Sequence, residues 1–162
     1  MATMDPFFMA RRHSVFAMRR DGCDTDDTLL RPWSTVTQSV GRAVMSIAAN
    51  IVIALIALLH LWFLVLEMFL WTKPAGRRAF GLTAEFAEQS KALAANQGLY
   101  NGFLAAGLFW GLSLGSAGLS VKLFFLGCVL VAGIFGGLTA NRKILWIQAL
   151  PAVIGLALIL LA

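Results

Sequence analysis

A long apolar run from Met45 to Trp71, MSIAANIVIALIALLHLWFLVLEMFLW, limits the possible folds more than any other feature of the chain. A helix needs about 20 mostly apolar residues to cross the hydrocarbon core of a bilayer, which is about 30 Å thick. This run exceeds that length and holds only two ionisable side chains, His60 and Glu67. It therefore predicts a membrane-spanning helix with two polar groups embedded in it.

The composition supports membrane insertion. The chain is 59% hydrophobic and 13% charged, about half the charged share of a soluble domain, and its mean hydropathy is +0.80. The net charge of +5 comes from basic residues beside apolar segments, which is typical of topology signals. We therefore expect the lipid bilayer, and not nucleic acid, as the partner. Cys23 and Cys128 have no zinc or disulfide spacing, so no metal and no cofactor are expected.

Four apolar segments are long enough to span a membrane, at about 46–71, 99–117, 119–140 and 144–162. The loop at 72–98 contains a pattern typical of a short amphipathic helix, with Thr83 as N-cap and Gly98 at its end. The predicted fold is therefore all-α, an integral membrane bundle of four transmembrane helices with one amphipathic cytoplasmic loop helix.

Basic residues near the membrane predict the orientation. In a four-span topology the loop 72–98 and the turn 141–143 lie on one side, and that side carries Lys73, Arg77, Arg78, Lys91, Arg142 and Lys143. We therefore expect a multi-pass protein of the bacterial cytoplasmic (inner) membrane, with the loop cytoplasmic and the C-terminus outside.

The first 44 residues differ from the rest, residues 45–162, which form the predicted transmembrane domain. They carry five of the eight acidic residues, and no sustained helical or strand period is recognised in them. They are predicted to be a disordered N-terminal extension. Because the apolar run begins at once after Met45, we expect translation to start there, so that residues 1–44 reflect a mis-called start. The alternative is a genuine tail.

Small residues indicate how the helices pack. Stripes of glycine at four-residue intervals allow close approach of membrane helices, and they comprise Gly107, Gly111 and Gly115 in the second span and Gly133 and Gly137 in the third. Pro151 removes a backbone donor from the fourth span and is expected to bend it.

Polar residues recur at one depth in the predicted bundle. His60 and Glu67 are seven residues apart and therefore share a helix face with Trp71. The predicted cytoplasm-side layer, a pocket for a ligand or a proton, comprises His60, Glu67, Trp71, Asn96, Gln97, Tyr100, Asn101 and Gln148. Because such groups are costly when they face lipid, they must face other helices or a wet cavity.

Two interpretations of this layer remain open. In the first, the polar groups only fix the helix register, with Glu67 paired to Arg77, Arg78 or Arg142. In the second, Glu67 and His60 bind a ligand or relay a proton in a pocket that opens to the cytoplasm.

Two stretches resemble a known family. HLWFLVLEMFLWTKPAGRRAFG and LAANQGLYNGFLAAGL are similar to the domain of unknown function 1304 family, small bacterial four-helix integral membrane proteins. The resemblance covers residues 45–162, and members of the family are typically about as long as that segment. It implies the four-helix membrane fold, and it implies no activity.

The function stays open between three classes. In the first, the chain binds or transports a small apolar or cationic molecule, which the sequence does not identify. A bundle this small would need to form a homo-oligomer to enclose a transport path. Alternatively, it is a membrane enzyme acting on a lipid-like substrate, or a structural or accessory subunit. An enzyme is less favoured, because residues 45–162 hold one histidine and no HxxxH or DxxD pattern.

Overall fold

The computed structural model describes residues 27–162, with side chains from Trp33 onward, and throughout that range the regular structure is helical. The elements are α1 (Asp27–Met68), α2 (Pro74–Phe80), α3 (Ala84–Ser113), the short η1 (Gly115–Gly118), α4 (Leu119–Thr139), the π-helical η2 (Leu145–Ala149) and α5 (Leu150–Leu161). The predicted all-α class is confirmed.

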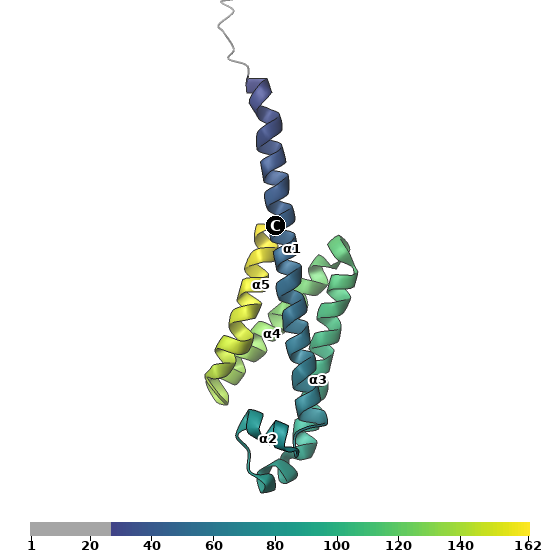
Figure 1. Ribbon diagram of the computed structural model, residues 1–162, viewed down its shortest axis with the longest axis vertical. Helices are drawn as coiled ribbons and strands as arrows, with labels where there is room; N and C mark the ends of the chain where they lie inside the picture. Colours follow the sequence, from purple (N-terminus) through teal and green to yellow (C-terminus); the bar gives the residue numbers. More distant parts are fainter. Residues whose placement is uncertain (1–26) are drawn as a thin grey trace, which may run out of the picture.

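Helix α1 is longer than predicted and begins at Asp27. Residues 27–44 are therefore helical, and for them the expectation of disorder is wrong; residues 1–26 lie outside the described part of the chain. The sequence reading missed a helical period in the apolar residues Trp33, Val36, Val40 and Val44. This part of α1 extends beyond the other helices (Figure 1), and residues 33–47 are exposed.

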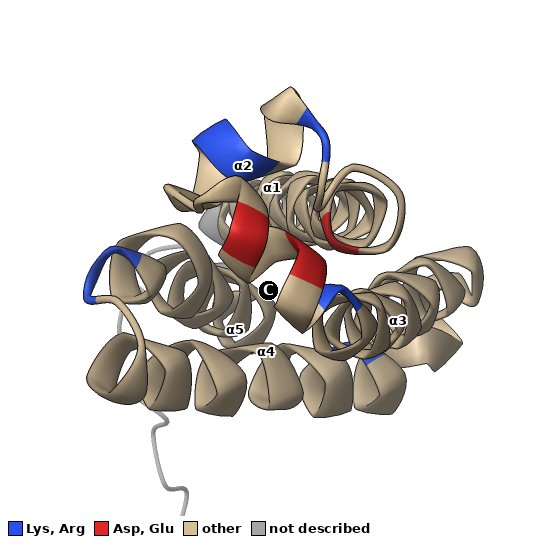
Figure 2. Cartoon of the chain, turned by 90° about the horizontal axis from the view of Figure 1, so that it is seen from below, with Lys and Arg blue, Asp and Glu red and all other residues tan. Residues whose placement is uncertain are grey.

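The long helices form a small bundle in which α1 packs against α3 and α5, and α4 packs against the same two helices. Viewed along the long axis, α1, α3 and α5 are seen nearly end-on, whereas α4 runs across the view (Figure 2). The buried core lies where they meet and comprises Ile53, Ile56, Ala57, Leu108, Leu126, Val129 and Ala152. The core is small because each helix buries only a narrow face.

Helix α3 is a single helix from the loop region to Ser113. Thr83 caps it as predicted, since its Oγ1 accepts a hydrogen bond from Phe86 N at 3.2 Å. The predicted end at Gly98 is wrong, so there is no separate loop helix at 83–98. Gly98 instead packs on α1, where a Cβ atom would lie 3.2 Å from Leu64 O and 2.8 Å from Met68 Cγ.

The connection between α1 and α3 is built from Pro74 at the start of α2 and Gly81 at its end. Pro74 occupies the first turn of α2, where its missing N–H costs nothing. Gly81 adopts a left-handed conformation with φ of 67°, which ends the helix. Helix α2 lies at the same end of the molecule as the turn between α4 and α5 (Figure 1). We call this end, formed by residues 73–91 and 140–144, the basic end.

The glycines of the predicted stripes meet different neighbours. A Cβ atom on Gly107 would lie 2.2 Å from the Phe125 ring, and one on Gly111 would lie 3.1 Å from Lys122 N. On α4, a Cβ atom on Gly133 would lie 2.7 Å from Ala149 N, and Gly137 faces the Leu145 side chain. Gly115 differs from the expectation, because it lies beyond the end of α3 with φ of 58° and turns the chain into α4.

The backbone adapts to Pro151 through the π-helical turn η2, in which Leu150 N donates to Leu145 O. Proline cannot donate a hydrogen bond, and its ring clashes with the carbonyl four residues earlier in a regular α-helix. A wider turn immediately before Pro151 relieves both constraints. The fourth predicted segment is therefore helical but changes its pitch at Ala149.

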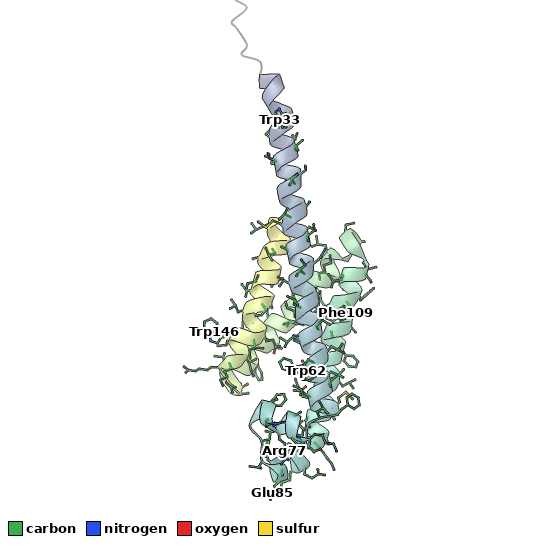
Figure 3. All side chains as sticks on the ribbon, viewed as in Figure 1. Trp33, Trp62, Arg77, Glu85, Phe109 and Trp146 are labelled. Carbon is green, nitrogen blue, oxygen red and sulfur yellow. The ribbon has the colours of Figure 1, made fainter. Side chains whose placement is uncertain are left out.

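The outer surface of the bundle is strongly apolar. Among many exposed large side chains, Phe124 is 65% exposed, Phe135 68% and Leu138 78%, and Trp146 points away from the bundle (Figure 3). Two helical segments, Trp33–Met68 and Gly115–Thr139, are long and apolar enough to cross a membrane, and Leu145–Leu161 is apolar but shorter. This distribution suggests a membrane location.

Candidate functional site

The inner face of α1 carries both of its embedded ionisable side chains. His60 is fully buried and Glu67 is 9% exposed, and the same face holds the core residues Ile53 and Ile56. The seven-residue spacing that placed His60 and Glu67 on one face therefore also places both of them against other helices of the bundle.

The Glu67 carboxylate contacts helix α3. Asn101 Nδ2 donates a hydrogen bond to Glu67 Oε2 at 2.7 Å, and Asn101 is also 9% exposed. The distance is typical of a hydrogen bond to a charged acceptor. The contact joins the end of α1 to the middle of α3 across 34 positions of sequence.

Two glycines bring α1 and α3 close together around this hydrogen bond. A Cβ atom on Gly98 would lie 3.0 Å from Glu67 Cβ, and one on Gly102 would lie 2.5 Å from Leu64 Cδ1. A Cβ atom on Gly102 meets the flexible end of the Leu64 side chain, which can turn aside, whereas one on Gly98 also meets the α1 backbone at Leu64 O, 3.2 Å away. Gly98 therefore helps to set the distance at which Asn101 reaches Glu67.

His60 has one satisfied ring nitrogen and one unsatisfied one. Nδ1 lies 2.8 Å from Ile56 O, and because a carbonyl oxygen only accepts, Nδ1 is the donor. Nε2 is buried and has no hydrogen-bond partner. An unpaired buried polar atom is costly and rare in proteins, so Nε2 is an acceptor available to water or a ligand.

Trp71 takes part in a different contact. Its Nε1 donates to Ser90 Oγ at 3.0 Å, and Ser90 Oγ donates to Phe86 O at 2.6 Å. The Trp71 ring also packs on Phe80 of α2, with ring centroids 4.9 Å apart. Trp71 thus fixes the α1–α2 turn onto the start of α3.

The remaining residues of the predicted layer do not join Glu67. Asn96, Gln97 and Tyr100 are exposed on α3. Gln148 Nε2 donates to Val129 O at 3.3 Å and ties η2 to α4. The structure therefore brings Glu67 and Asn101 together, places Trp71 and Gln148 in separate contacts, and leaves Asn96, Gln97 and Tyr100 exposed.

The arginines expected to neutralise Glu67 lie elsewhere. In the described part of the chain the ion pair is between Lys91 and Glu88 on the surface of α3, so the pairing of Glu67 with an arginine, which belonged to the first of the two open interpretations, is not formed there. Arg77 and Arg78 line a shallow pocket of about 390 Å³ on α2 together with Pro74, Gly81 and Leu82. Arg78 Nε donates to Pro74 O at 3.2 Å, whereas Arg77 Nε is buried without a partner.

A second buried polar cluster lies at the opposite end of the bundle and was missed from the sequence. Lys122 is 8% exposed, and its Nζ donates to Asn50 Oδ1 at 3.0 Å and to Gly115 O at 3.1 Å. A lysine and an asparagine within apolar segments were the available signal, because isolated polar groups in such segments seek each other.

No group of three or more His, Cys, Asp or Glu side chains that could hold a metal ion is found among the described residues. The buried ionisable groups on the inner face of α1 are the Glu67 carboxylate and the His60 imidazole.

Comparison with known proteins places the chain in a family. The family described as "Protein of unknown function (DUF1304)" matches residues 54–160, which include His60, Glu67 and Asn101. A curated relative, "Uncharacterized protein YpaA" from Lactococcus lactis subsp. lactis (strain IL1403), is 32% identical over 114 residues, which cover 69% of this chain and 96% of the relative. No solved structure matches. The resemblance noted from the sequence is thereby confirmed, and the chain belongs to the DUF1304 family.

Proposed function

We propose that the chain is a multi-pass integral membrane protein whose four long helical segments all cross the bilayer. The support is the apolar outer surface, where large side chains such as Phe124, Phe135 and Leu160 are more than half exposed. In water such a surface would aggregate, whereas in lipid it is favourable. In helix α3, the part that follows Gly98 crosses the bilayer, and η2 and α5 together form the fourth crossing segment.

The basic end faces the cytoplasm in this proposal. Lysines and arginines of α2 and of the α4–η2 turn lie at that end (Figure 2), in agreement with the positive-inside rule. The C-terminus and the turn at Gly115–Gly118 then lie outside. Glu67 is located near the cytoplasmic boundary, one residue before the end of α1 at Met68, and His60 lies about 10 Å deeper.

The function that the site supports best is binding of a small organic cation at Glu67. One observation carries this proposal: Glu67 is a buried carboxylate whose partner is the neutral amide of Asn101. A buried carboxylate without a positive partner is unfavourable unless it is protonated or acquires one. A cationic ligand or a proton supplies that charge, and the nearby membrane favours a ligand with an apolar part.

His60 supports the same chemistry at greater depth. Its unpaired Nε2 accepts a hydrogen bond, so both groups on the inner face of α1 favour a ligand that carries N–H donors. Leu64, half-buried between them, provides an apolar contact. The site is therefore complementary to an amine or amidine that bears a hydrophobic substituent.

A matched pair of ligands tests this proposal. Benzylammonium and benzyl alcohol have nearly the same size, but only the first is positively charged. We expect the purified protein in detergent to bind benzylammonium more tightly than benzyl alcohol, as measured by calorimetry or ligand-observed NMR. Glu67→Gln should abolish this preference, and Glu88→Gln, at an exposed glutamate of α3, should preserve it. Equal binding of both ligands by the unaltered chain would refute the proposal.

The alternative of a membrane enzyme has less support. Acid–base catalysis requires both groups within hydrogen-bonding reach of one substrate, whereas His60 and Glu67 are separated by two helical turns, about 10.5 Å. An accessory role, with Asn96, Gln97 and Tyr100 docking a partner, is consistent with their exposure. No contact of these three residues favours it over binding at Glu67.

A further inference from the structure

One face of α1 is apolar and exposed along most of the helix. The stripe comprises Trp33, Val36, Val40, Val44, Ile47, Ile51, Leu55 and Leu58, all of which are between 52% and 73% exposed. We call these residues the α1 stripe. Helices α3 and α5 pack on the opposite face, where Ile53, Ala57 and His60 are buried. No contact within the described chain covers the α1 stripe.

The spacing of the stripe is regular. Its members follow each other at intervals of three, four, four, three, four, four and three residues, so the pattern repeats every eleven residues. On a helix they fall within an arc of about 100°, as in a helix–helix seam. An eleven-residue repeat keeps such a seam aligned in a slightly right-handed supercoil.

Half of the stripe lies beyond the bundle. The part from Trp33 to Val44 continues straight past the ends of the other helices (Figures 1 and 3). Lipid can cover Ile47 to Leu58, but a straight helix that leaves the membrane carries its outer part into water. Four large apolar side chains in water on one face require another partner.

The charges on α1 permit a second copy of the same chain at this face. Arg42 is the charged residue between Trp33 and Leu58, and it lies on the side opposite the stripe, together with Gln38, Ser39 and Ser46. Identical charges therefore do not meet across a seam formed by two copies. Because all copies insert with the same orientation under the proposed topology, their α1 helices run parallel and the stripes match residue for residue.

The area is also sufficient. From the exposed fractions of the eight side chains, the stripe offers on the order of 800 Å² per chain, similar to the ~800 Å² that each partner contributes to a standard interface. We propose that the protein is a parallel homodimer in which the α1 stripes of two copies pack against each other, with α3, α4 and α5 of each copy on the outer sides. In this arrangement the two Glu67 sites remain on separate faces.

Disulfide cross-linking in membranes tests the seam. The chain is prepared with Cys23→Ser and Cys128→Ser and with one new cysteine at a time. Val40→Cys and Val44→Cys should each form a covalent dimer on oxidation, because matching seam residues of two parallel helices lie within disulfide range. Ser39→Cys, on the opposite face, should stay monomeric. Failure of both seam variants, or equal cross-linking at Ser39, would overturn the proposal.

The mass of the protein in detergent gives a second, independent test. The unaltered chain should have the mass of two copies by light scattering. Val40→Lys should shift it to one copy, and Ser39→Lys should leave the dimer intact. Both positions are exposed in the single chain, so folding of the bundle is not affected. A mass of one copy, or of three or more, for the unaltered chain would overturn the paired arrangement. Benzylammonium binding at Glu67 is measured separately, so this proposal can fail without the proposed function.

Discussion

Asn101 donates a hydrogen bond of 2.7 Å to the buried carboxylate of Glu67, and this contact links α3 to the C-terminal end of α1. Glu67 comes from an apolar segment, whereas Asn101 follows the polar residues Asn96, Gln97 and Tyr100 and precedes an apolar stretch. The contact is therefore the polar centre of the α1–α3 interface, and several measurable properties depend on it.

Asn101→Ala should destabilise the protein by about 1–3 kcal/mol, because it leaves Glu67 buried without its donor. The measurement is thermal unfolding in detergent, with a lower Tm expected. Asn96→Ala is the matched control, since Asn96 is exposed on the same helix and its replacement should leave Tm nearly unchanged. Equal Tm values for the Asn101 variant and the unaltered chain would contradict a structural role of this hydrogen bond.

Gly98→Ala should reduce the free energy of unfolding by about 1–3 kcal/mol, and Tm should therefore also fall. The added Cβ atom would lie 2.8 Å from Met68 Cγ and 3.2 Å from Leu64 O, so α1 and α3 must separate. Gly127→Ala provides the control, because a Cβ atom at Gly127 meets nothing within 4 Å and alanine is favoured over glycine within helices. The expected order of Tm is therefore Gly127→Ala at or above the unaltered chain, and Gly98→Ala below it. The reverse order would contradict the close packing at Gly98.

The helical fold could be predicted from the periodicity and composition of the apolar segments, whereas the contacts of the candidate site could not. The shared face of His60 and Glu67 followed from their spacing. The choice of Asn101 over Asn96 did not, because the sequence reading ended a helix at Gly98 and so lost its phase. In the continuous α3 helix, Ala94, Gly98 and Asn101 lie on one buried face. From the sequence alone, a glycine that permits close helix packing cannot be distinguished from a glycine that ends a helix.

The extension of α1 was missed for a related reason. Six arginines and five aspartates are distributed through residues 1–44, and they concealed the apolar period that begins at Trp33. The pairing of Lys122 with Asn50 was also not predictable, since it depends on how η1 connects α3 to α4 at the end of the bundle opposite the basic end.

Lys122→Met should destabilise the end of the bundle that lies opposite the basic end. The methionine retains the apolar stem but removes the donor to Asn50 Oδ1 and Gly115 O, at a cost of about 1–3 kcal/mol. Lys143→Met, at an exposed lysine of the basic end, is the control. Thermal unfolding should show a lower Tm for the first variant, whereas similar values for both would indicate that the Lys122 contacts contribute little.

Reporter fusions in a bacterial host test the orientation. Alkaline phosphatase attached after Ala162 should be active, and green fluorescent protein at the same position should be dark, because the C-terminus is proposed to lie outside. Fusions after Gly81, in the α2–α3 turn, should give the opposite pair of results. Fluorescence at the C-terminus would reverse the proposed orientation.

The most direct test of the central proposal is chemical modification of Glu67 in membranes. Dicyclohexylcarbodiimide is apolar and converts a protonated carboxyl group into a stable N-acylurea, which mass spectrometry can locate. If Glu67 binds organic cations, benzylammonium should protect Glu67 from modification in a concentration-dependent manner, and benzyl alcohol at the same concentrations should not. Modification of Glu67 that is unaffected by benzylammonium would contradict the account.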